Sequence, residues 1–359
     1  MGNSFHTRLL ALFATSLLPS GLYAQATIRP VPGVALAWER GTALASAKRE
    51  RTSSVREADF SHLSPLQVKP AVVKPEDTQA PDSVGSEFAQ LEFTADYVGL
   101  SGMEGGGGDI TTMRGGWKGS LGEWTPNGTS FSLELGTEGS FYDFGAPAAG
   151  PTASVAGVSD PFNDVYDTRL GARFVTRRSP KMSFYGGLEV GVAGEDAVSL
   201  DDSVYTGGAL AMRYDASPKF ALMLGVAGVS RFDDSTWILP YLGFDWRITE
   251  SLRLKTEAAE VHMDYDINKA WSFGMEATYG FRQYRLNQEG PLNGGSFRDE
   301  EVRAGLNIGW QATDDIRLEL SAGKMLWREV RFHDGQAGYL GEAELGKKEY
   351  AAFGLSVTF

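Results

Sequence analysis

The sequence predicts an all-β protein built from antiparallel strands. Three observations lead to this prediction: apolar residues recur at every second position over much of residues 87–359, glycine is frequent at 44 of 359 residues, and short turn-like connections alternate with longer ones. A period of two is the side-chain period of a strand whose two faces meet different surroundings. The mean hydropathy of −0.22 does not indicate a bundle of membrane helices.

The N-terminal residues predict export from the cytoplasm. Residues 1–26 combine a basic start at Arg8, a run of apolar residues that ends at Leu18, and the small residues Ala24 and Ala26. This order is typical of a secretory signal peptide, and the apolar run is shorter than the roughly 20 residues that a membrane-spanning helix needs. We expect cleavage after Ala26, with cleavage after Ala24 as the alternative.

The next segment, residues 27–86, has a different composition. It includes "SPLQVKPAVVKPEDTQAPDSVGS", which is rich in proline and charge and sustains neither the strand period nor the helix period. Such a segment buries too little apolar surface to offset the entropy lost on ordering. We therefore expect a disordered tether in the periplasm.

From Glu87 onward the alternation predicts strands as far as the C-terminus. In "EVRAGLNIGWQ", for example, Leu306, Ile308 and Trp310 alternate with Gly305, Asn307 and Gly309. The expected strands number about 14, or 12 if the two short ones around "LRLKTEAAEVHMDYDI" form a single bent excursion. They cover residues 87–98, 110–118, 129–144, 163–177, 181–193, 203–214, 219–231, 237–248, 252–257, 260–266, 270–286, 299–312, 315–331 and 349–359.

The connections favour a membrane barrel over a soluble β-sandwich, which has the same alternation. Turns such as "RRSPK", "DASPK" and "ATDDI" alternate along the chain with long segments such as "LSGMEGGGGD" and "NQEGPLNGGSF". Short periplasmic turns and longer outer loops are typical of bacterial outer-membrane barrels, in which an even strand number returns both chain ends to the periplasm. Tryptophans expected near the strand ends fit the aromatic girdles of such barrels: Trp117, Trp124, Trp246, Trp271 and Trp310 on the short-turn side, Trp237 and Trp327 on the long-loop side.

The chain ends in "EYAAFGLSVTF", with Phe353, Leu355, Val357 and the terminal Phe359 on one face. This ending resembles the assembly signal of bacterial outer-membrane barrels. More broadly, residues 87–359, including "WILPYLGFDWRITESLRL", resemble porin-like outer-membrane barrels of uncharacterised families. The resemblance implies a transmembrane, up-and-down antiparallel barrel in the outer membrane of a Gram-negative cell. It also implies contact with outer-membrane lipid and lipopolysaccharide, and recognition of the C-terminal strand by the barrel-assembly machinery.

Charged side chains of both signs fall on the face that would point into the lumen of such a barrel. The expected lumenal residues are Glu134, Glu138, Asp167, Arg169, Arg173, Glu189, Asp245, Arg247, Glu276, Arg282, Arg303, Arg317 and Glu319. Buried charges must be paired or hydrated. A wet lumen predicts a passive, porin-like diffusion channel for small solutes or ions, and this is the function we expect. The alternative is a closed structural barrel whose charges cross-link one another.

Other chemistry finds little support in the sequence. The absence of cysteine excludes disulfides and thiolate sites, and a net charge of −13 argues against a nucleic-acid surface. His262 shares a strand face with Asp264 and Asp266, which leaves a hydrolase as a less favoured alternative, but no nucleophile lies at a recognisable spacing. We expect no cofactor and no metal site, and the oligomeric state stays open.

Overall fold

The structure is a computed structural model, and it describes residues 86–102, 109–125, 128–144, 162, 164–196, 198–232, 236–257, 259–290 and 292–359. The expected signal peptide lies outside these residues, as does the expected tether apart from Ser86. Strands dominate the described residues, and the helix α3 (Leu200–Ser203) has four residues. Among the described residues, no helix is long and apolar enough to cross a membrane.

The strands follow one another along the chain with short or long connections. Their bounds are β1 (Ser86–Gly102), β2 (Asp109–Trp124), β3 (Thr129–Phe144), β4 (Asp164–Ser179), β5 (Met182–Glu195), β6 (Val204–Ser217), β7 (Phe220–Val229), β8 (Trp237–Arg247), β9 (Leu252–Glu257), β10 (Glu260–Asp266), β11 (Trp271–Arg285), β12 (Ser296–Gln311), β13 (Ile316–His333), β14 (Tyr339–Glu344) and β15 (Glu349–Thr358).

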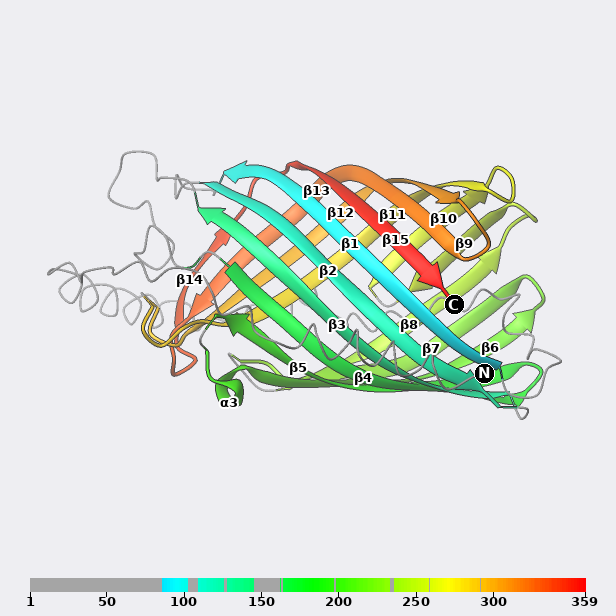
Figure 1. Cartoon of the computed structure of the whole chain (residues 1–359), viewed down its shortest axis with the longest axis horizontal. Coiled ribbons are helices and arrows are strands. Elements are labelled where there is room, and N and C mark those ends of the chain that lie inside the picture. Colours follow the sequence, from blue (N-terminus) through cyan, green and yellow to red (C-terminus); the bar gives the residue numbers. More distant parts are fainter. Residues whose placement is uncertain are drawn as a thin grey trace, which may run out of the picture. The chain divides into compact units, whose positions relative to one another are not determined.

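Fourteen of these strands close into an antiparallel barrel (Figure 1). Each strand from β1 to β13 pairs with the next along the chain, β13 pairs with β15, and β15 pairs with β1. The closing register matches Gln90 to Thr358 and Val98 to Tyr350. The prediction of a 14-strand barrel is confirmed, and the alternative of 12 is wrong because β9 and β10 are separate paired strands.

The structure differs from the sequence prediction in two places that matter below. The stretch around "HDGQAGYLGE", expected to be a loop, contains β14, which pairs only with β13 and extends it beyond the ring. Strand β12 begins at Ser296 rather than at residue 299. In both places the residues lack a sustained apolar–polar alternation, so the sequence pattern did not identify them as strand.

The outer surface of the barrel is apolar, as alternation requires for a wall facing lipid. Leu188, Ile238 and Leu242 are 74%, 75% and 69% exposed, while their chain neighbours point inward. Trp271 and Trp310 stack on this surface at the short-turn end, with ring centroids 5.8 Å apart. On the long-loop side the girdle prediction is wrong for Trp237, which points inward and packs against the core.

Candidate functional site: the barrel lumen

The lumen is partly exposed in its half near the short turns. Arg317 and Glu319 are neighbours on the inner face of β13, 3.5 Å apart, and both side chains are 39% exposed. On the other side of the closing strand β15, Lys118 of β2 pairs with Glu92 of β1 at 2.7 Å, again with partial exposure. Partial exposure of charges on an inner face indicates that water reaches this part of the lumen.

Other charges pair along the inner wall, between adjacent strands or across one intervening strand. Glu134 of β3 accepts from Arg173 of β4 at 2.7 Å. Asp245 of β8 accepts from Arg213 of β6 at 3.0 Å and from Arg253 of β9 at 2.8 Å. These side chains are less exposed than the Arg317–Glu319 pair, so the exposure of charges is uneven within this half of the lumen.

Nearer the long-loop end the central charges are buried. Asp299 of β12 lies 2.8 Å from Arg114 of β2 and 2.7 Å from Arg328 of β13, and all three side chains are at most 2% exposed. Arg114 also pairs with Glu301 at 3.0 Å, while Arg303 pairs with Asp96 of β1 at 2.9 Å. We call this group, together with the Glu138–Arg282 pair described next, the buried charge network.

Some contacts of the network span the lumen from one wall to the opposite one. Arg282 of β11 donates through Nε to Glu138 of β3 at 2.9 Å, and the hydroxyls of Ser140 and Tyr284 join the same two strands at 3.0 Å. The hydroxyl of Tyr142 donates to Asp299 at 2.8 Å. Because β3 and β11 stand on opposite sides of the ring, these bonds cross the lumen directly.

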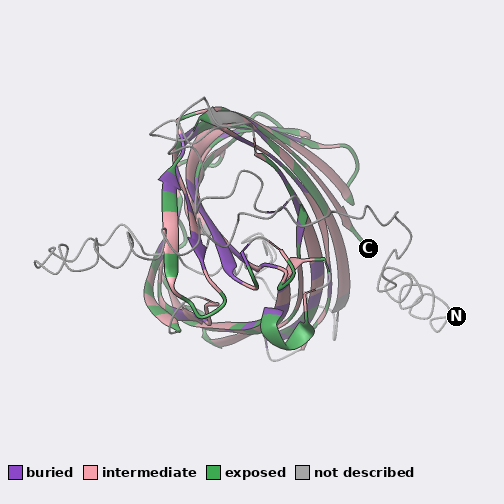
Figure 2. Cartoon of the chain, turned by 90° about the vertical axis from the view of Figure 1, so that its left-hand side faces the viewer, coloured by how far each residue is buried: buried purple, intermediate pink, exposed green. Residues whose placement is uncertain are grey.

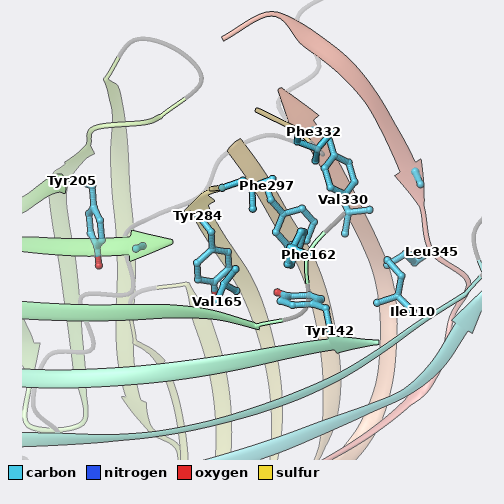
Figure 3. Packing of buried hydrophobic residues seen from close by; sticks show 14 of the residues in the cluster. Ile110, Tyr142, Phe162, Val165, Tyr205, Tyr284, Phe297, Val330, Phe332 and Leu345 are labelled. Atoms are coloured by element: carbon cyan, nitrogen blue, oxygen red, sulfur yellow. The ribbon is translucent and has the colours of Figure 1, made fainter. Parts of the chain in front are cut away.

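An aromatic layer lies next to the buried charge network (Figure 3). Phe297 is in contact with Tyr142, Phe162 and Phe332, with ring centroids 5.1, 4.6 and 5.1 Å apart. Val165 and Leu345 belong to the same buried cluster. Viewed from the long-loop end, buried strand segments lie inside the ring of strands (Figure 2). In this conformation the long-loop end of the lumen is therefore filled by protein.

The structure places the charged residues singled out by the sequence on inward-facing positions, but these residues lie in different parts of the lumen. Glu138, Arg282 and Arg303 lie in the buried charge network. Arg317 and Glu319 lie in the exposed half, and Glu276 accepts from the hydroxyl of Tyr350 at 3.0 Å. The others, on β3 to β5 and β8, are buried or half-buried: Glu134, Asp167, Arg169, Arg173, Glu189, Asp245 and Arg247. Arg303 lies 5.0 Å from the ring centroid of Tyr350, whose hydroxyl donates to Glu276.

The sequence prediction missed the residues at the centre of the network: Asp96, Arg114, Asp299, Glu301 and Arg328. A signal was present in "FRDEEV", where charges occupy four successive positions from Arg298 to Glu301. In a wall between lipid and lumen, only every second residue faces the lumen. Charged residues on both faces of a strand therefore indicate a segment that does not face lipid on either side.

His262 lies 2.9 Å from Glu260 on β10, a pairing within the inner charged surface. Within the residues that the structure describes, there is no group of three or more side chains that could hold a metal ion. The terminal residues Phe353 and Phe359 lie on the outer face, 40% and 56% exposed, with Leu355 and Val357 at the same parity of β15.

Comparison with known proteins gives a family and a set of distant structural relatives. Among solved structures, the COG4313 outer membrane channel from Pseudomonas putida F1 is 10% identical, with a TM-score of 0.40 and coverage of 85% of this chain and 100% of that one. The P. putida toluene transporter TodX is 11% identical, with a TM-score of 0.44 and coverage of 81% and 93%. The KdgM porin in complex with disordered oligogalacturonate is 9% identical, with a TM-score of 0.34 and coverage of 75% and 99%.

No curated protein matches the chain. The profile of a domain of unknown function, DUF6268, matches residues 162–350, from Phe162 of the aromatic layer to Tyr350 of β15. This match spans more than half of the chain and includes ten complete strands of the barrel, β4 to β13. The chain, an outer-membrane-type β-barrel, belongs to the DUF6268 family.

Proposed function

We propose that the barrel is a passive diffusion channel for small solutes or ions across the outer membrane of a Gram-negative cell. The observation that carries the proposal is the partial exposure of inward-facing charges of both signs, above all Arg317 and Glu319 at 39% each. Barrels of about eight strands are filled by their own side chains, and wider ones leave room for water. A ring of 14 strands with hydrated charges suits selection among small charged or polar molecules.

The buried charge network favours a second candidate, a closed structural barrel without transport. Arg114, Asp299 and Arg328 are paired and at most 2% exposed, as expected of a permanent plug. The two candidates differ in a simple observable, because a permanent plug conducts no ions. A hydrolase has less support, since the described residues around His262 form ion pairs without a positioned nucleophile.

The proposal includes the surroundings of the barrel. Its exposed apolar face would contact outer-membrane lipid and lipopolysaccharide. Phe353, Leu355, Val357 and Phe359 would be recognised by the barrel-assembly machinery, because they line the outer face of the last strand. Because β1 begins and β15 ends at the short-turn end, the N-terminal residues would lie in the periplasm.

Single-channel recording in a planar bilayer tests the proposal. Purified protein should give discrete conductance steps, and Arg317→Glu should shift the ion selectivity toward cations because it reverses a hydrated lumenal charge. Arg178→Glu is the matched control, since Arg178 is an exposed arginine at the β4–β5 turn. A correctly folded protein that never conducts, in any variant, would favour the structural barrel.

A further inference from the structure

The barrel wall is incomplete on one side in its long-loop half. Strands β9 and β10 have only six and seven residues. The pairing of β8 with β9 covers Asp245–Arg247, and that of β10 with β11 covers Ser272–Thr278 of β11. Beyond these residues, toward the long-loop end, the hydrogen-bonded ladder between β8 and β11 is interrupted. The part of β11 after Thr278 therefore pairs with the wall through β12 rather than on both sides.

The strands beyond this interruption leave the wall and enter the lumen. All six residues Ser296–Glu301 of β12 are buried, on both faces. One face carries Asp299 and Glu301, which bind Arg114 of β2. The other carries Arg298, whose guanidinium lies 5.9 Å from the ring centroid of Trp237 in β8. A strand in a wall facing lipid would expose one of its faces.

A β-bulge lies where this change begins. The register between β12 and β13 shifts between Val302 and Arg303, directly after the doubly buried residues. Bulges bend a strand and increase its twist, and they are frequent at the rims of barrels. The bulge therefore marks the bend at which the ends of β11, β12 and β13 turn inward. We call the part beyond it, residues 279–290, 292–302 and 328–333, the inserted segment.

The inserted segment reaches the opposite wall and is held there by polar contacts as well as by the aromatic layer. Arg282 binds Glu138 of β3 at 2.9 Å. Arg285 forms a parallel backbone bridge with Gly194 of β5, and the amide of Asn287 donates to Glu195 at 2.7 Å. These contacts join the inserted segment to strands that belong to the rigid, fully paired side of the barrel.

We propose that the inserted segment is the gate of the channel, and that the Glu138–Arg282 pair is the contact that holds it closed. This inference rests on the proposed channel function. Solutes pass when the segment swings away from β3 and β5 about the bulge at Val302 and Arg303. The facing surfaces of the inserted segment and of the opposite wall carry ion pairs as well as aromatic rings. Water that enters between the two surfaces therefore solvates the charges on each of them.

Charge reversal at the closing pair tests the gate in purified, full-length protein. Glu138→Arg and Arg282→Glu each place like charges 2.9 Å apart where a pair stood, and each should raise the open probability in a planar bilayer several-fold. The swapped double variant, Glu138→Arg with Arg282→Glu, should return it to the wild-type value. Arg317→Glu is the control, because its effect should be on ion selectivity and not on open probability.

The outcomes separate the gate from the channel itself. If the wild-type protein conducts and the reversals leave its open probability unchanged, the gate is wrong and the channel stands. If neither wild type nor variants conduct although all keep the heat-modifiable fold, the channel proposal fails as well. Should a reversal prevent folding, Glu138→Gln and Arg282→Gln remove the charge attraction with little change of shape, and they should move the open probability in the same direction.

Discussion

Replacement of Asp299 by alanine should destabilise the barrel strongly. The carboxylate of Asp299 is 0% exposed and accepts four hydrogen bonds: from Arg114 at 2.8 Å, from Tyr142 at 2.8 Å, and twice from Arg328 at 2.9 and 2.7 Å. Alanine removes the acceptor and leaves Arg328 buried with its charge only partly balanced, because Glu301 lies 4.0 Å away.

The size of the change in the free energy of unfolding depends on the interactions that the remaining partners of Asp299 keep. Breaking a buried ion pair by removing one member costs about 3–5 kcal/mol, since the other charge stays desolvated. The four hydrogen bonds do not add independently, because Arg114 keeps its bonds to Glu301 at 3.0 and 3.1 Å. We therefore expect the free energy of unfolding to fall by about 3–5 kcal/mol rather than by the sum of four charged hydrogen bonds.

Equilibrium unfolding in urea, with the barrel refolded into lipid vesicles, measures this change. Glu319→Ala is the matched control: it also removes a paired carboxylate, but one that is 39% exposed, and should change the free energy of unfolding by less than about 1 kcal/mol. If the free energy of unfolding of Asp299→Ala lies within about 1 kcal/mol of the wild-type value, the buried charge network is hydrated. That result would refute a dry long-loop half of the lumen.

Three further predictions concern assembly and the wall. Deletion of Phe359 should lower the amount of heat-modifiable barrel in the outer membrane, because it removes the exposed aromatic residue that ends the chain; unchanged levels would argue against an assembly signal. A chain in which Ala26 is joined directly to Gly85 should still insert and resist protease, since the barrel begins at Ser86. Gly323→Ala should destabilise the barrel by about 1–3 kcal/mol in urea unfolding, because the added methyl group would overlap the carbonyl oxygen of Ala304. Gly102→Ala, where nothing lies within 4 Å, should have little effect and serves as its control.

Much of the wall could be predicted from the sequence because its determinants are local. The period of two in "EVRAGLNIGWQ" or "EYAAFGLSVTF" assigns each residue to the lipid face or the lumen face without knowledge of any partner strand. The order of short and long connections then determines which strands are neighbours, since consecutive antiparallel strands pair through their hairpins. The strand number of 14 and the inward position of Arg317 and Glu319 follow from these two local rules.

The inside of the barrel was decided by tertiary structure. Arg114 and Glu301 are 187 residues apart, and Glu138 and Arg282 are 144 apart, so their contacts depend on how the closed ring brings distant strands face to face. The inward turn of β11 to β13 depends on the shortness of β9 and β10, which interrupts the ladder on one side. A period of two predicts which way a side chain points from its own strand, but it carries no information about where that strand leaves the wall. Local alternation thus specifies the lipid-facing surface and the number of strands, while the closing of the lumen depends on contacts across the ring.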